Sequence, residues 1–171
     1  MSSVPGHPPR NRDADLPALG IRGGGWVTIQ VVLIAGVFLS AVVGLGWPRS
    51  LAPVFYAVGA VLVAAGAALL VAGAIGLGSA LTPFPAPRST GELQTGGVYR
   101  LARHPMYGGG ILIALGWSAI FATVVGLALT LLLAVFADLK SRREELWLER
   151  HYADYGAYRL RTRHRLIPFV W

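Results

Sequence analysis

The stretch GELQTGGVYRLARHPMY, residues 91–107, is a long polar interruption in a chain otherwise built from apolar runs. Apolar segments precede and follow it, so its charged side chains are expected at a membrane surface. The chain has 171 residues, of which 54% are hydrophobic and only 13% are charged, against about 25% charged in an ordinary globular domain. The apolar residues come in blocks long enough to cross a bilayer. The composition therefore predicts an all-α integral membrane protein.

The apolar blocks predict about four transmembrane helices. Residues 26–47 carry no charge and begin and end with tryptophan, and residues 53–78 form a second block. Residues 107–137 contain no charge over 31 positions, which as one helix would be roughly 46 Å, too long for a hydrocarbon core of about 30 Å. We therefore expect a hairpin that turns near residues 122–124. The expected spans are residues 26–47, 53–78, 106–121 and 124–145.

Three glycines of the second block share one face of the expected helix. Gly59, Gly66 and Gly73 recur at intervals of seven. Small residues at such spacing allow a neighbouring helix to approach closely. The alternative is that they reflect only the high content of small residues in this block.

The distribution of basic residues favours four spans over three. With four spans, 14 of the 15 Lys and Arg residues lie on one side of the membrane and only Arg49 lies on the other. Basic residues concentrate in cytoplasmic segments, so we expect both termini and the 79–106 loop in the cytoplasm. Three spans would translocate the eight basic residues from Lys140 to Arg165. Residues 1–25 are expected to form a flexible cytoplasmic tail, followed by a membrane domain of residues 26–171.

Several kinds of site are not expected in this chain. It has no cysteine, which excludes disulfides, thiolate metal sites and a cysteine nucleophile. The four histidines lack metal-ligand spacing, and no HExxH, GxSxG or Walker sequence occurs, so no metal is expected. A net charge of +7 would suit nucleic acid, but in a membrane protein it indicates anionic headgroups instead. We therefore expect membrane lipids as partners and no nucleic acid.

Residues 103–107, Arg-His-Pro-Met-Tyr, are typical of a helix start. Pro105 disfavours helical geometry at the residue before it and suits the first position of a helix. His104 is therefore expected at the N-cap of the third span, beside backbone N–H groups that attract a carboxylate or phosphate. An ordinary helix start, with arginine and tyrosine as interfacial residues, is the alternative.

The adjacent pair Glu144–Glu145 lies near the cytoplasmic end of the fourth span. One interpretation is a solvated helix face with ion pairs between neighbouring turns. The other is that one of the two carboxylates binds a cationic group of a cofactor, such as an amino-acid ammonium. Nearby tyrosines then surround a cation or an adenine ring, although tyrosines at this depth more often form a membrane aromatic belt.

The order of these motifs resembles the isoprenylcysteine carboxyl methyltransferase family, to which phospholipid N-methyltransferases are related. The motifs that carry the resemblance, over residues 53–171, are Gly96-Gly97-Val98-Tyr99, Arg103-His104-Pro105-Met106-Tyr107, an apolar hairpin, Glu144-Glu145, Tyr155, Tyr158 and Ile167-Pro168. The resemblance implies an integral membrane enzyme that transfers a methyl group from S-adenosylmethionine to a carboxylate or amine. The implied acceptor is a lipophilic small molecule or a lipidated molecule at the cytoplasmic face.

The resemblance also implies where the cofactor binds. The 79–106 loop and the C-terminal segment would form the site together, with Arg159 or Arg163 as further contacts. No catalytic residue is implied. The implied cofactor-binding residues are Tyr99, Arg103, His104, Tyr107, Glu144 and Glu145.

Two other functions remain open at this point. A membrane reductase of the sterol or steroid type uses NADPH and has a similar Arg-His-x-x-Tyr element, but the Glu144–Glu145 pair favours the methyltransferase. A non-catalytic membrane protein whose basic C-terminal segment binds anionic lipid is the second alternative. The heavy use of alanine, valine and arginine is typical of a GC-rich bacterial genome, so the expected location is a bacterial inner membrane.

Overall fold

The computed structural model describes residues 16–17, 19–20, 23–82, 84 and 92–171, and within these ranges it contains helices and no strands. This confirms the predicted all-α class. Most of the expected tail, residues 1–25, lies outside the described residues, as does part of the 79–106 loop. The long helices are α1 (Gly24–Leu39), α2 (Ala52–Leu77), α3 (Pro105–Ile120) and α4 (Val124–His151). The short ones are α5 (Tyr155–Arg161) and the 3-10 turns η2 (Ser40–Val43), η3 (Gly78–Ala80) and η4 (Gly97–Arg100).

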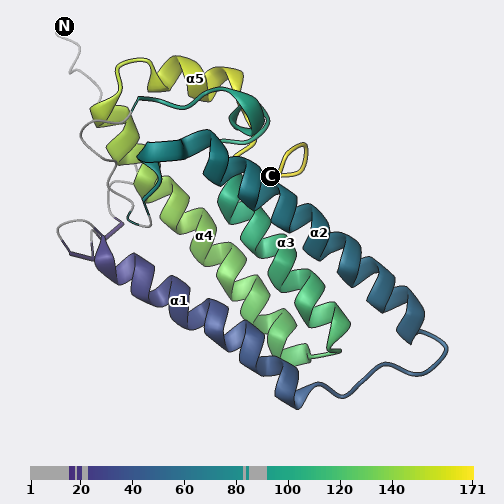
Figure 1. The fold of residues 1–171 in the computed structure, drawn as a ribbon. Coiled ribbons are helices and arrows are strands. Elements are labelled where there is room, and N and C mark those ends of the chain that lie inside the picture. The colour runs from purple at the N-terminus through teal and green to yellow at the C-terminus, as the bar shows by residue number, and fades with distance from the viewer. Residues whose placement is uncertain (1–15, 18, 21–22, 83, 85–91) are drawn as a thin grey trace, which may run out of the picture.

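The long helices form a bundle in which α3 and α4 lie between α1 and α2 (Figure 1). Within the described part of the chain, three helical stretches are long and apolar enough to cross a membrane: Gly24–Val43, Ala52–Ala80 and Val124–His151. Helix α3 occupies the place of the expected third span, but its 16 residues extend only roughly 24 Å. The apolar helices confirm the prediction of an integral membrane protein.

The first helix ends earlier than the apolar block suggested. Helix α1 reaches Leu39 and continues as η2 to Val43, whereas residues 44–47 are not helical. Gly44 and Gly46 lower the helix propensity here, and Gly46 adopts a left-handed conformation with φ +72°. Trp47 does not continue the helix but donates a hydrogen bond from Nε1 to the carbonyl of Ala119.

The glycines spaced by seven lie where α2 meets α3. Gly59, Gly66 and Gly73 are all buried. A Cβ at Gly66 would lie 2.6 Å from the carbonyl oxygen of Gly109, and one at Gly59 would lie 2.8 Å from that of Gly116. Real Cβ atoms do not approach backbone so closely, so both positions require glycine. The predicted close helix approach is confirmed, and α3 contributes matching glycines at the same spacing.

The turn between α3 and α4 lies where the sequence predicted it. Helix α3 ends at Ile120 and α4 begins at Val124. The Thr123 hydroxyl caps α4 by accepting a hydrogen bond from the Gly126 backbone N–H at 3.1 Å. Ala122 completes the turn in a left-handed conformation with φ +50°. A four-helix arrangement with a tight hairpin is therefore present.

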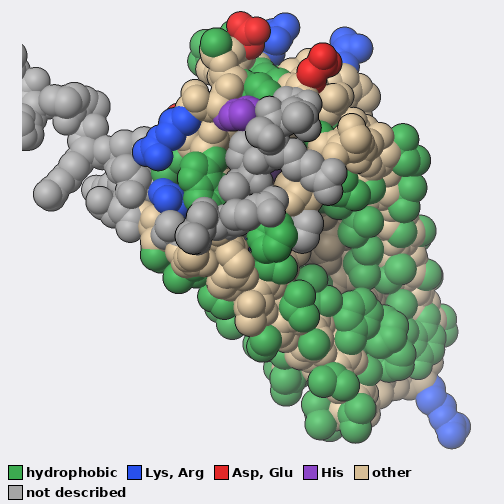
Figure 2. Space-filling model, turned by 60° about the vertical axis from the view of Figure 1, so that its left-hand side comes forward, with side chains coloured by type: hydrophobic (Ala, Val, Ile, Leu, Met, Phe, Trp, Pro, Cys, Tyr) green, Lys and Arg blue, Asp and Glu red, His purple; other side chains and the backbone are tan. Residues whose placement is uncertain are grey.

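The polar parts of the chain gather at one end of the bundle. Figure 1 shows η4, α5 and the last turns of α4 at this end, while the α1–α2 connection and the α3–α4 turn lie at the other. In the space-filling view, hydrophobic side chains cover the flank of the bundle and most charged side chains gather near α5 (Figure 2). The chain thus assembles most of its charged residues at one end of the bundle, whereas Arg49 lies in the α1–α2 connection at the other end.

Candidate functional site

His104 is the N-cap of α3 and Pro105 is the first residue of the helix, as predicted. The preceding turn η4 begins at Gly97, whose φ of +54° lies in the left-handed region that favours glycine. The turn buries Tyr99, whose hydroxyl donates to the carbonyl of Gly73 in α2 at 3.1 Å. These contacts fix the loop against α2 and set the direction in which the His104 side chain points.

The C-terminal segment that follows α5, residues 162–171, is joined to the start of α3 by backbone hydrogen bonds. The N–H of Arg103 donates to the carbonyl of His164 at 3.1 Å, and that of His104 donates to the carbonyl of Arg165 at 2.7 Å. The next residue, Leu166, is fully buried in a cluster with residues of α3 and α4. The two segments predicted to share a site are therefore in direct contact.

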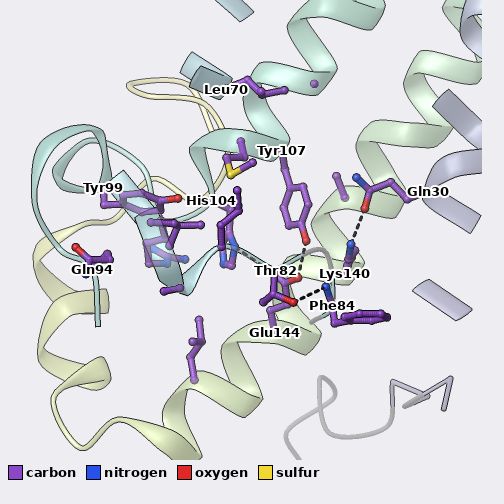
Figure 3. A pocket seen from close by; sticks show the side chains of 18 of the residues that line it. Gln30, Leu70, Thr82, Phe84, Gln94, Tyr99, His104, Tyr107, Lys140 and Glu144 are labelled. Atoms are coloured by element: carbon purple, nitrogen blue, oxygen red, sulfur yellow. Dashed lines mark hydrogen bonds and ion pairs between the residues drawn. The ribbon is translucent and has the colours of Figure 1, made fainter. Parts of the chain in front are cut away.

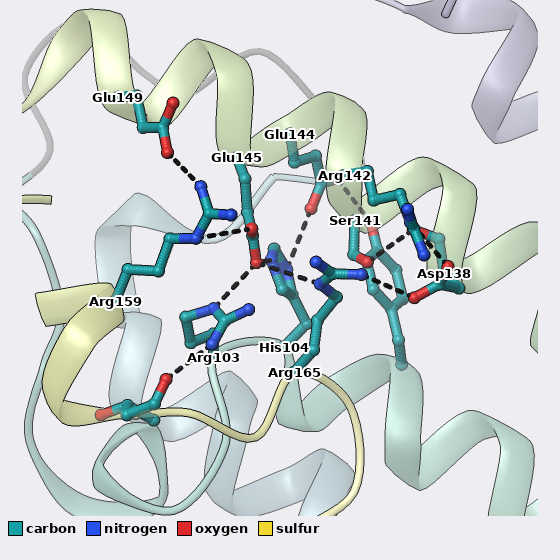
Figure 4. A network of polar contacts seen from close by, with 12 residues as sticks. Arg103, His104, Asp138, Ser141, Arg142, Glu144, Glu145, Glu149, Arg159 and Arg165 are labelled. Carbon is teal, nitrogen blue, oxygen red and sulfur yellow. Dashed lines mark hydrogen bonds and ion pairs between the residues drawn. The ribbon is translucent and has the colours of Figure 1, made fainter. Parts of the chain in front are cut away.

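Glu145 lies at the centre of a buried network of ion pairs (Figure 4). Its side chain is 4% exposed. Its Oε1 atom accepts a hydrogen bond from Arg103 Nε at 2.8 Å, and it lies 3.3 Å from His104 Nε2 and 3.4 Å from Arg165 Nε. Neighbouring positive groups thus compensate its charge. Glu145 holds α4, the start of α3 and the C-terminal segment together.

The two arginines extend this network. Arg103 donates from Nη1 to the carbonyls of Thr162 and Arg163, at 2.6 and 2.9 Å. Arg165 donates from Nη1 to Oδ1 of Asp138 in α4 at 2.8 Å. The guanidinium of Arg103, predicted as a cofactor contact, therefore also anchors the C-terminal segment.

Glu144 has different surroundings from Glu145 and lines a cavity. Its Oε1 atom accepts a hydrogen bond from the Tyr107 hydroxyl at 2.5 Å, and its Oε2 atom lies 3.3 Å from His104 Nδ1. The rings of His104 and Tyr107 are nearly parallel, with centroids 5.8 Å apart. A carboxylate offers about four acceptor positions, so Glu144 retains the capacity to bind a cationic ligand group.

His104 faces both carboxylates at once. Burial by itself lowers the pKa of His104, but the carboxylates of Glu144 and Glu145, each with an oxygen 3.3 Å from a ring nitrogen, outweigh it, so the pKa is raised above the usual 6.5. The raised pKa favours the imidazolium form. In that form His104 attracts both carboxylates of α4.

A cavity of about 530 Å³ opens between the helices beside Glu144 (Figure 3). This volume lies within the range of about 300–1,000 Å³ that is typical of ligand sites. Its polar end is lined by Tyr99, Arg103, His104, Tyr107, Glu144 and Tyr155. An apolar arm continues between the helices and is lined by Ile34, Leu70, Ile111, Leu133 and Phe136.

The structure brings the predicted cofactor-binding residues into one cluster. The five that line the cavity are Tyr99, Arg103, His104, Tyr107 and Glu144, and their contact with a cofactor stays a prediction. Glu145 is not among the lining residues, because it lies in the ion-pair network behind them. Arg159 is not among them either, and its Nη1 lies 2.5 Å from Glu149 Oε1. Arg163 contributes its backbone carbonyl to Arg103.

Lys140 and Gln30 are among the polar lining residues of the cavity that were not predicted as site residues. Lys140 is 1% exposed, and its Nζ donates to Oε1 of Gln30 in α1 at 2.5 Å. The same ammonium lies 5.1 Å from the centroid of the Tyr107 ring. The sequence held a signal for both, since Lys140 is the only lysine of the chain and Gln30 is an amide inside an uncharged apolar block.

Comparison with known protein families gives one match. The family model described as phospholipid methyltransferase matches residues 54–155, which is more than half of the chain. The matched range contains α2 except its first two residues, η4, α3 and α4, and with them all six residues named above for the polar end of the cavity. No curated protein and no solved structure matches the chain. The match confirms the resemblance found in the sequence motifs.

Proposed function

The chain belongs to the phospholipid methyltransferase family, and from this premise we propose that it transfers a methyl group from S-adenosylmethionine to a lipophilic acceptor in the membrane. The observation that carries the proposal is that one cavity has both a polar end and an apolar arm. Its polar end lies at His104 and Glu144, and its apolar arm runs between the helices. A water-soluble donor and a membrane-bound acceptor require such a site, because the two must meet without either leaving its own phase.

The residues of the polar end fit S-adenosylmethionine by their chemistry. This cofactor carries an amino-acid ammonium and a sulfonium, and when bound it supplies an activated methyl group. Glu144 offers a carboxylate for the ammonium, and the rings of Tyr99, Tyr107 and Tyr155 offer aromatic faces for a cation. No residue with metal-binding chemistry is needed for this transfer.

The chain fixes these groups before a ligand arrives. The hydroxyl of Tyr107 and the imidazole of His104 both hold Glu144, so little side-chain freedom remains to be lost on binding. Burial raises the pKa of Tyr99 well above its usual value, so its hydroxyl remains a donor to the Gly73 carbonyl. Preorganised positioning and exclusion of water are what a methyl transfer from an activated donor requires.

The acceptor group determines what further chemistry the chain must supply. A carboxylate acceptor needs no general base, as in the isoprenylcysteine carboxyl methyltransferases that the motifs resemble. An amine acceptor must lose a proton, and Glu144, a carboxylate that lines the polar end of the cavity, is placed to receive it. The basic residues near this end indicate that it faces the cytoplasm.

The proposal is tested by ligand binding and by methyl transfer. Protein purified in a neutral detergent is titrated with S-adenosylhomocysteine and, separately, with NADPH. We expect binding of S-adenosylhomocysteine only, and a loss of at least tenfold in affinity in Glu144→Gln. We also expect the protein to transfer labelled methyl groups from S-adenosylmethionine into a lipid extract. Binding of NADPH alone would show that the reductase function is correct instead.

A further inference from the structure

The Tyr107 ring divides the cavity into two sides. The His104 ring lies nearly parallel to it, and the ammonium of Lys140 lies over it. Figure 3 shows His104 and Tyr99 to one side of Tyr107, and Lys140 and Gln30 to the other. The side with His104 is the one that the proposed function assigns to the cofactor. The other side therefore has a positive charge of its own, separated from the cofactor side by an aromatic ring.

Lys140 points into the protein rather than toward lipid headgroups. Lysines near the end of a membrane helix usually extend to the interface, where their charge is hydrated. Lys140 instead is 1% exposed and donates to Gln30 of α1 across the bundle. Burying an ammonium costs free energy, and ionisable groups inside membrane segments are usually retained for function. The inward orientation therefore indicates a binding role.

The residue type at position 140 supports the same role. The other 14 basic residues of the chain are arginines. Lysine is a compact point charge on a flexible stem, which binds a phosphate or carboxylate without the planar geometry that arginine imposes. A single lysine, at a buried position facing a cavity, suits contact with an anionic ligand group.

The lining residues of α4 change in character along the cavity. Leu133 and Phe136 line the apolar arm, Lys140 follows one turn later, and Glu144 follows after another turn. Residues three and four apart share one face of a helix, so these side chains form a row. An amphiphile lying along this row would place its hydrocarbon chain in the apolar arm, its charged group at Lys140 and its reactive group toward Glu144.

We propose that Lys140 and Gln30 form an acceptor-binding subsite for an anionic group, a phosphate or a carboxylate, carried by an amphiphile whose chain occupies the apolar arm. The identity of this ligand as the methyl acceptor rests on the proposed function. Binding of the anion does not, because it requires neither cofactor nor methyl transfer. The ammonium supplies the charge, and the Gln30 carbonyl oxygen orients it.

The test measures equilibrium binding of three labelled probes to the detergent-solubilised protein: dodecyl phosphate, dodecanoate and dodecanol. We expect at least one of the anionic probes to bind, and the tighter one identifies the phosphate or carboxylate class. In Lys140→Met, that probe should bind at least tenfold more weakly, whereas dodecanol and S-adenosylhomocysteine should bind as before. Equal binding of the anionic probe to both proteins, or no anionic probe bound to the unmodified protein, overturns the proposal.

A second variant covers the case in which Lys140→Met does not fold. Gln30→Glu keeps the buried lysine and places a carboxylate against it, which should exclude the anionic probe while leaving dodecanol binding unchanged. Arg150→Met, at an exposed position of the same helix, controls for net charge and should bind all probes normally. Equal weakening of all ligands in both cavity variants would show a structural role only. Failure of S-adenosylhomocysteine to bind any protein would count against the proposed function, not against the anion subsite.

Discussion

Two adjacent glutamates of α4 have different surroundings and therefore different expected roles. Consecutive residues on a helix point about 100° apart, which turns Glu145 into the ion-pair network and Glu144 toward the cavity. Glu145 contacts Arg103, His104 and Arg165, whereas Glu144 contacts His104 and Tyr107. The sequence alone did not distinguish the two. The structure indicates that only Glu144 has the position to meet a ligand.

Replacing Glu145 should therefore reduce stability strongly. Glu145→Gln leaves the buried guanidinium of Arg103 without its carboxylate, and breaking such a pair costs about 3–5 kcal/mol. Thermal unfolding in detergent measures the change. Glu149→Gln removes a more exposed pair with Arg159 and should cost less than about 1 kcal/mol. If both variants unfold at the temperature of the unmodified protein, the Glu145 network does not stabilise the fold.

The raised pKa of His104 predicts a pH dependence of stability. The folded protein binds the proton more tightly than the unfolded chain, where histidine has a pKa of about 6.5. The stabilising contribution is therefore fully present below about pH 6.5 and is lost as the pH rises through the raised value. We expect the difference in melting temperature between the unmodified protein and His104→Gln to shrink from pH 6 to pH 9. A difference that is constant, or larger at pH 9, would contradict an imidazolium at this position.

The sequence identified the residues of the polar end because they belong to a motif with a physical signature. Pro105 indicates a helix start, and this placed His104 at the N-cap. The lone Lys140 and the intramembrane Gln30 were not predicted as partners, because 110 positions of sequence separate them and no local pattern joins them. Only the packing of α1 against α4 brings the two together.

At the scale of elements, the packing of α2 on α3 predicts a strict requirement for glycine. Gly66→Val adds a side chain whose Cβ would lie 2.6 Å from the Gly109 carbonyl oxygen. The helices must separate, and overpacking of this kind costs typically about 1–3 kcal/mol. We expect a lower melting temperature in detergent. Gly110→Ala is the matched control, because a Cβ there meets nothing within 4 Å, and it should keep or raise the melting temperature.

The sequence predicted this contact better than it predicted the helix ends. A seven-residue spacing reports directly on one face of a helix, so Gly59, Gly66 and Gly73 indicated the interface with α3. The predicted end of the first helix was wrong by several residues. The apolar composition continues to Trp47, whereas the helix does not. Residues 44–47 instead contact the α3–α4 turn, as in the hydrogen bond from the N–H of Leu45 to the carbonyl of Ala122. A tertiary contact of this kind leaves no periodic signal.

At the scale of the whole molecule, the number of membrane crossings decides whether the site faces one compartment. The polar end of the cavity is built from the loop before α3, the end of α4 and α5, so these must all lie on one side. This requires α3 to cross the membrane together with α1, α2 and α4. Helix α3 has 16 residues, and unlike α1, which η2 extends to Val43, it is not prolonged by a 3-10 turn. Its glycine contacts with α2 hold it inside the bundle.

Single cysteines test this topology directly, because the chain contains none of its own. We expect Arg49→Cys, in the α1–α2 connection, and Phe121→Cys, at the α3–α4 turn, to react with a membrane-impermeant maleimide from the same side. Arg161→Cys in α5 should react only from the other side, which we expect to be the cytoplasmic side because the basic residues gather there. Labelling intact cells and inverted vesicles separates the two faces. If Arg161→Cys and Arg49→Cys react from the same side, an odd number of helices crosses the membrane. The loop before α3 and the segments after α4 would then lie in different compartments, which would contradict a shared site.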